Sequence, residues 1–146
     1  MKSILLVLSF CAMLFCGCSK AVKETQLFGV WKQNPQSLAF AGTLHWIKLN
    51  SDKTFEMKLA RFSDMIDAEP VPCPNNHTDF VKGTYQFNDG KISFSGAFCD
   101  ENFSQIQPNC RGEDSYQEFF SVTFEEQEMV FDIEKQESKQ IWLRRQ

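Results

Sequence analysis

The side chains best suited to chemistry are cysteines and one histidine in the second half of this 146-residue chain. His77 follows Cys73 at the spacing Cys-x-x-x-His, and Cys99 and Cys110 come later. Three cysteines can form one disulfide in three ways and leave one thiol over. With His77, the same cysteines could instead hold zinc, which prefers thiolate and imidazole ligands. No Cys-x-x-Cys pair supports the metal, so the sequence favours one disulfide that ties loops together.

Catalysis has little support in the sequence. His45 stands beside Trp46 in an alternating segment and is expected to be a sheet residue. His77 could form an acid–base pair with Asp79, or activate a cysteine nucleophile. No nucleophile elbow, phosphate-binding glycine loop or metal motif accompanies these residues. We therefore expect neither an enzyme nor a cofactor.

A different chemistry is expected at the N-terminus, where Cys18 follows the pattern of a secretory signal. Lys2 is basic, residues 4–15 are apolar except for Ser9, and the small residue Gly17 precedes Cys18. The apolar stretch is shorter than the ~20 residues that a membrane-spanning helix needs. The pattern predicts cleavage after Gly17 and lipid attachment to Cys18. A soluble secreted protein is the alternative, because Gly17 would also suit an ordinary signal protease.

The segment Phe15-Cys16-Gly17-Cys18 resembles the lipobox of bacterial lipoproteins. Phe15 stands where leucine is usual, while Gly17-Cys18 keeps the essential pair. Cys16 is a poor alternative acceptor, because bulky Phe15 precedes it. The resemblance implies a protein of the bacterial cell envelope, anchored by acyl chains such as palmitate. The outer membrane is favoured, with the domain in the periplasm or at the surface.

Composition favours one all-β domain after this signal. The chain has 15 phenylalanines, seven glycines and three tryptophans, which suits short strands around an aromatic core. Its 19 acidic residues outnumber its 15 basic ones, which argues against a nucleic-acid partner. We expect a signal peptide at 1–17, a lipidated cysteine and tether at 18–26, and one barrel domain at 27–146.

Period-two alternation predicts a single antiparallel up-and-down barrel of about eight strands. Asn88-Asp89-Gly90 is the strongest hairpin signal. The long segment 61–79 is expected to be a loop with a short helical turn at 63–68. The expected strands are 27–33, 43–50, 53–60, 80–88, 91–98, 115–124, 129–133 and 141–143.

Connection lengths predict that the two ends of this barrel differ. Short connections at 50–52, 89–90 and 125–127 should lie at one end, because alternate connections of a meander share an end. Long connections at 34–42, 61–79 and 99–114 should lie at the other. Cys73, Cys99, Cys110 and His77 are therefore expected at the long-loop end.

Gly29-x-Trp31 on the first strand, with Arg144 or Arg145 on the last, resembles a lipocalin-like (calycin) domain. Residues 49–55 and Gly83-Thr84-Tyr85 are also similar to small bacterial lipocalin-like lipoproteins. The resemblance implies that Trp31 plugs a closed end of the barrel and that one arginine packs across its ring. Cation–π attraction supports such a pair.

Two functions are compatible with the sequence. The first is binding of a small apolar or amphipathic molecule at the long-loop end, where a cavity of several hundred Å³ would favour it. The second is a non-enzymatic structural or protein-interaction lipoprotein, because side chains alone can fill a small barrel. The candidate lining residues for a ligand are Phe55, Tyr85, Phe87, Phe94, Phe98 and Phe120.

Overall fold

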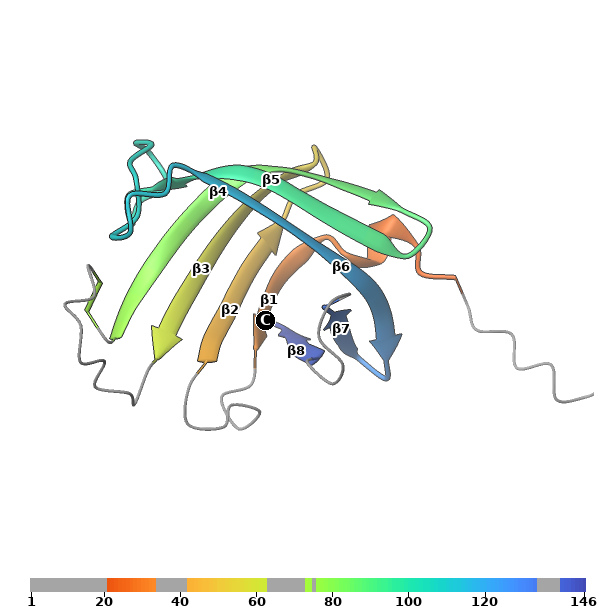
Figure 1. The fold of residues 1–146 in the computed structure, drawn as a ribbon. Coiled ribbons are helices and arrows are strands. Elements are labelled where there is room, and N and C mark those ends of the chain that lie inside the picture. The colour runs from red at the N-terminus through yellow and green to blue at the C-terminus, as the bar shows by residue number, and fades with distance from the viewer. Residues whose placement is uncertain (1–20, 34–41, 63–72, 75, 134–139) are drawn as a thin grey trace, which may run out of the picture.

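Eight antiparallel strands form a closed barrel in the computed structural model, which describes residues 21–33, 42–62, 73–74, 76–133 and 140–146 (Figure 1). Each strand pairs with the next along the chain, and β8 closes the barrel against β1. The predicted all-β, up-and-down barrel is thereby confirmed. A short 3-10 turn, η1 (Glu24–Gln26), precedes it. The strands are β1 (Gly29–Gln33), β2 (Gly42–Leu49), β3 (Thr54–Phe62), β4 (Asn76–Asn88), β5 (Lys91–Cys99), β6 (Ser115–Glu125), β7 (Glu128–Asp132) and β8 (Gln140–Arg145).

Alternation of apolar and polar side chains accounts for the strands near the hairpins. On β3, Phe55 and Met57 are buried inside the barrel, whereas Glu56 lies outside and pairs with Lys48 of β2. The β4–β5 hairpin turns at residues 89–90, and both of these have positive φ (48° and 74°), as a type I′ turn requires.

The expected loop at 61–79 is wrong at both ends. β3 continues to Phe62, and β4 already begins at Asn76. The predicted helical turn at 63–68 lies outside the described residues. Apolar alternation stops in this region because the inward positions hold polar side chains, among them Arg61 and Asp79. Strand pairing nevertheless continues through these positions. A rule that reads strands from apolar alternation therefore ends them too early.

The two ends of the barrel differ as expected. The hairpins β2–β3, β4–β5 and β6–β7 share one end, and η1 and the start of β1 lie there too. The orange N-terminal segment enters this end on the right of Figure 1. At the opposite end, the Cys73–Cys110 disulfide joins the segment before β4 to the β5–β6 connection.

The core between the ends is aromatic. The Phe94 ring lies 4.9 Å from that of Phe55, 6.1 Å from that of Phe120 and 6.4 Å from that of Tyr85. These three neighbours come from strands β3, β6 and β4, so one ring connects much of the interior. Among the described residues, no helix is long and apolar enough to cross a membrane.

Candidate functional site

Trp31 is held at the hairpin end by groups from three parts of the chain. Its side chain is 2% exposed, and its Nε1 donates a 2.7 Å hydrogen bond to the carbonyl of Leu27. The Arg145 guanidinium lies 4.9 Å from the indole centre, and the Phe124 ring meets the indole edge at 5.8 Å. Arg144 takes no part in this stack and pairs with Glu128 on the neighbouring strand. The structure thus selects Arg145 from the two candidate arginines.

Gly29 is needed here for its backbone conformation. Its φ of +133° is one that L side chains rarely adopt. A Cβ at this position would meet Arg145 Nε at 3.8 Å, an ordinary contact distance. Close approach of another chain segment is therefore not the reason for this glycine.

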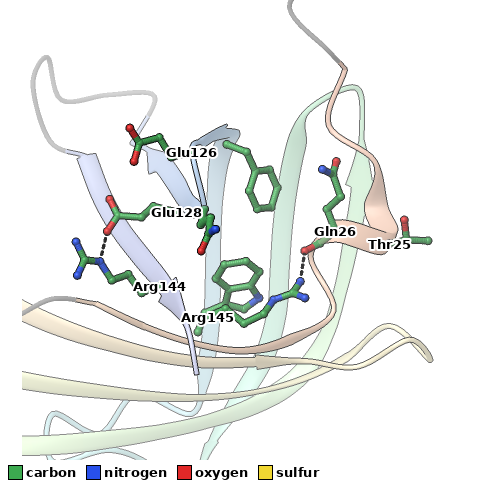
Figure 2. A pocket seen from close by; sticks show the side chains of 9 residues that line it. Thr25, Gln26, Glu126, Glu128, Arg144 and Arg145 are labelled. Carbon is green, nitrogen blue, oxygen red and sulfur yellow. Dashed lines mark hydrogen bonds and ion pairs between the residues drawn. The ribbon is translucent and has the colours of Figure 1, made fainter.

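A wide cleft of about 1090 Å³ opens beside this cluster, between η1 and the β6–β7 hairpin (Figure 2). Its rim is polar and charged, with Gln26, Glu126 and Glu128 around it. Arg145 covers the indole of Trp31, so the ring is not free to stack on a ligand. The arrangement closes this end of the barrel and offers little apolar surface for binding.

The six aromatic side chains considered as ligand walls mainly contact one another or other core rings. Phe55, Tyr85, Phe94 and Phe120 are each 1–3% exposed and belong to one hydrophobic cluster. Phe98 is also buried, with its ring edge-to-face against Tyr116 at 6.1 Å, and Phe87 packs against the cluster. This part of the barrel is therefore filled by side chains.

Toward the long-loop end the interior becomes polar. Arg61 Nε donates a 2.8 Å hydrogen bond to Asp79 Oδ2. Asp79 is 6% exposed, and His77 Nε2 lies 3.6 Å from the same carboxylate oxygen. Arg61 follows buried Leu59 by two residues, and Asp79 precedes buried Val81 by two, so these side chains share the inner face.

His45 is a second polar group on this inner face. Its Nδ1 donates to Gln33 Oε1 at 3.0 Å, because the amide oxygen can only accept. Burial lowers the pKa of His45 to about 4, and the positive charge of Arg61 acts in the same direction. The imidazole is therefore neutral near pH 7.

Glu118 of β6 adds a carboxyl to the polar interior. Burial raises the pKa of Glu118, while a hydrogen bond from Tyr116 and the charge of Arg61 oppose that rise. Burial also raises the pKa of Tyr116 well above its usual value. Arg61 thus acts electrostatically on Asp79, His45 and Glu118 together. We call Arg61, Asp79, His45 and Glu118 the inner polar cluster.

A cleft of about 380 Å³ opens at the rim of the long-loop end, and Asp79 is the member of the inner polar cluster that lines it. His77, Asp79 and Phe98 contribute to its lining, together with Cys99 and Cys110.

Of the three predicted disulfide pairings, the structure contains Cys73–Cys110. Within the described part of the chain Cys99 has no disulfide partner, and it is 4% exposed at the end of β5. The zinc set of Cys73, His77, Cys99 and Cys110, the less favoured alternative from the sequence, is not assembled: Cys99 is outside the group of potential ligand atoms that lie together, and two of the thiols are oxidised. Cys18 lies outside the described residues.

From the sequence, His77 and Asp79 were considered as a pair and His45 as a sheet residue, whereas Arg61 and Glu118 were not identified. A signal for both was present in the spacing. Arg61 and Glu118 each stand two residues from a buried apolar side chain on the same strand. Comparison with protein-family models, curated proteins and solved structures gave no match.

Proposed function

We propose that this chain is a lipid-anchored lipoprotein of the bacterial envelope, with a lipocalin-like barrel that binds a small amphipathic molecule at its long-loop end. The polar part of the ligand would lie near the inner polar cluster, and its apolar part would lie against the neighbouring core residues. The activity is binding, without catalysis or a cofactor.

The inner polar cluster is the observation that carries this proposal. Ionisable side chains inside a small barrel are costly, because each loses hydration that its partners only partly replace. A barrel with a purely structural task could fill the same positions with apolar groups. Arg61, Asp79 and Glu118 instead place one cation and two carboxyls in the interior. Perturbed ionisable groups beside a cleft are typical of binding sites.

An amphipathic ligand fits the change of character along the barrel. Asp79 and Val81 are successive inward residues of β4, and Arg61 follows Leu59 on β3. On each of these two adjacent strands, one inward residue is polar and the next inward residue is apolar. A molecule with one polar and one apolar end would match both.

The anchor is proposed from the sequence pattern around Gly17-Cys18 and is compatible with the fold. β1 begins at the hairpin end, so a chain tethered through Cys18 enters the barrel there. Lipid on Cys18 would then place the hairpin end toward the membrane and the long-loop end away from it.

Three environment-sensitive fluorescent probes test ligand binding: one anionic, one cationic and one neutral, each amphipathic. We expect at least one of them to bind at micromolar concentration. Glu118→Gln should change the affinity for a charged probe, because it removes a carboxyl from the interior. Glu56→Gln is the matched control, since Glu56 lies on the outer face of β3.

Failure of all three probes to bind would overturn the ligand proposal. It would favour the second function, a structural or protein-interaction lipoprotein. The mutual packing of Phe55, Phe94 and Phe120 supports that alternative, because it shows part of the interior to be filled.

The anchor is tested by mass spectrometry of the protein extracted from bacterial envelopes. We expect acyl chains on Cys18, and Cys18→Ala should lose both the added mass and the membrane association. Cys16→Ala is the matched control and should keep them. An unmodified chain with Cys18 intact would contradict the anchor while leaving the binding proposal untouched.

A further inference from the structure

Three potential metal ligands meet at the rim of the long-loop end. The Sγ atoms of Cys73 and Cys110 and a ring nitrogen of His77 all lie within 4.8 Å of one another. The two sulfurs come from segments 37 residues apart, and the disulfide holds them together. Thiolate and imidazole are the ligand pair that zinc and similar cations select.

The hydrogen bond at Nδ1 of His77 leaves the other ring nitrogen, Nε2, to coordinate a metal ion. Its Nδ1 lies 2.8 Å from the carbonyl oxygen of Pro74. A carbonyl oxygen only accepts hydrogen bonds, so Nδ1 carries the proton and the neutral ring has its lone pair on Nε2. Metal-binding histidines are commonly oriented in this way, with the second ring nitrogen donating to a backbone carbonyl.

Among the described residues, Nε2 of His77 lacks a hydrogen bond. It is buried, and within the described part of the chain it has no hydrogen-bond partner. Asp79 Oδ2 lies 3.6 Å away, but that carboxylate is already bonded to Arg61. A buried acceptor nitrogen without a donor is unfavourable, and a bound cation would satisfy it.

We propose that reduction of the Cys73–Cys110 disulfide converts this cluster into a binding site for zinc or another thiophilic divalent cation, with Cys73, His77 and Cys110 as ligands. A dithiol would supply two electrons and two protons, break the S–S bond and become a disulfide itself. Cation binding then releases the two thiol protons to solvent. This metal site is a separate proposal from the binding of an amphipathic ligand and does not depend on it.

Solvent access to these residues also favours the proposed metal site. Cys110 is exposed, so a dithiol can attack its sulfur, whereas Cys73 is buried and His77 is partly buried. The 380 Å³ cleft includes His77 and Cys110 in its lining, which gives a cation a path from solvent. Cys99 is buried outside this set and is not a ligand.

Cobalt(II) is the probe, because its thiolate complexes absorb in the near ultraviolet and visible range. The full-length protein is reduced with a dithiol, desalted without oxygen and titrated with Co²⁺, then with Zn²⁺ as a competitor. We expect one Co²⁺ per reduced chain, displacement by Zn²⁺, and a metal-dependent rise in melting temperature. The oxidised protein should show none of the three changes.

Variants distinguish these ligands from other thiols. Cys110→Ser removes one of the two thiolate ligands and should weaken the thiolate bands, and His77→Ala should weaken Co²⁺ binding at least about tenfold. Cys99→Ser is the matched control and should bind like the wild type. No cobalt–thiolate absorption in the reduced wild type, whether or not it stays folded, would overturn the proposal. Equal binding by the oxidised protein or by His77→Ala would also overturn it.

Discussion

The guanidinium carbon of Arg145 lies 4.9 Å from the ring centre of Trp31, and Nη2 of the same arginine donates a 2.8 Å hydrogen bond to the carbonyl of Gln26. One side chain therefore links the last strand to the first strand and to η1. Trp31 and Arg145 are also paired in register across the β1–β8 seam that closes the barrel.

Replacing Arg145 should destabilise the barrel more than replacing its neighbour. Arg145→Ala removes the cation–π contact and the hydrogen bond to Gln26, so we expect a loss of about 1–2 kcal/mol in the free energy of unfolding. Arg144→Ala breaks only an exposed ion pair with Glu128 and should leave the free energy of unfolding almost unchanged. Urea denaturation measures both, and equal losses would contradict the role given to Arg145.

The paired glycines Gly83 and Gly96 should not tolerate a methyl group. A Cβ on Gly83 would lie 2.2 Å from the Ser95 carbonyl oxygen, and one on Gly96 would lie 2.4 Å from that of Lys82. Both neighbours are backbone atoms and cannot turn aside, so either alanine variant should lose about 3 kcal/mol in the free energy of unfolding.

Gly112→Ala is the comparison for these variants. Gly112 has φ +79°, but among the described residues no atom beyond its own chain neighbours lies within 4 Å of the position of a Cβ. Its replacement should cost only the backbone strain, about 1 kcal/mol. A Gly83 variant as stable as the Gly112 variant would show that β4 and β5 can separate at this point.

Acid should weaken the folded state through His45. Burial lowers its pKa from 6.5 to about 4, so between these values the unfolded chain binds a proton that the folded chain does not. Burial of the neutral His45 ring is therefore compatible with full stability of the folded state above pH 6.5. The free energy of unfolding falls as the pH drops from 6.5 toward 4, by roughly 3 kcal/mol at most. His45→Gln should flatten this part of the stability curve, as measured by urea denaturation from pH 7 to pH 4. An unchanged slope would contradict the assignment.

The disulfide should contribute substantially to stability. Cys73 and Cys110 are 37 residues apart in sequence, and closing such a loop restricts the unfolded chain by about 4 kcal/mol. The double replacement Cys73→Ser/Cys110→Ser should therefore lower the melting temperature strongly. Cys99→Ala removes one buried sulfur without changing connectivity and should cost only about 1 kcal/mol. Similar losses in thermal denaturation would show that the cross-link contributes little.

The sequence predicted the strands well where apolar alternation is regular. β5, with Ile92 and Phe94 facing the core, was expected at 91–98 and ends one residue later. The same rule failed between β3 and β4, because Arg61 and Asp79 occupy inward positions that the rule assigns to apolar residues. Hydrophobic periodicity detects a strand through its burial, so it loses the strand where the buried surface is polar.

By itself, the sequence determined the barrel, its direction and the difference between its two ends. These features follow from local patterns: alternation, the Asn88-Asp89-Gly90 turn and the lengths of the connections. Tertiary structure alone decided that Cys110 pairs with Cys73, that Arg145 covers Trp31, and that Arg61 meets Asp79 and acts on Glu118. Each of these choices depends on distances between side chains far apart in the chain, and only closure of the barrel sets those distances.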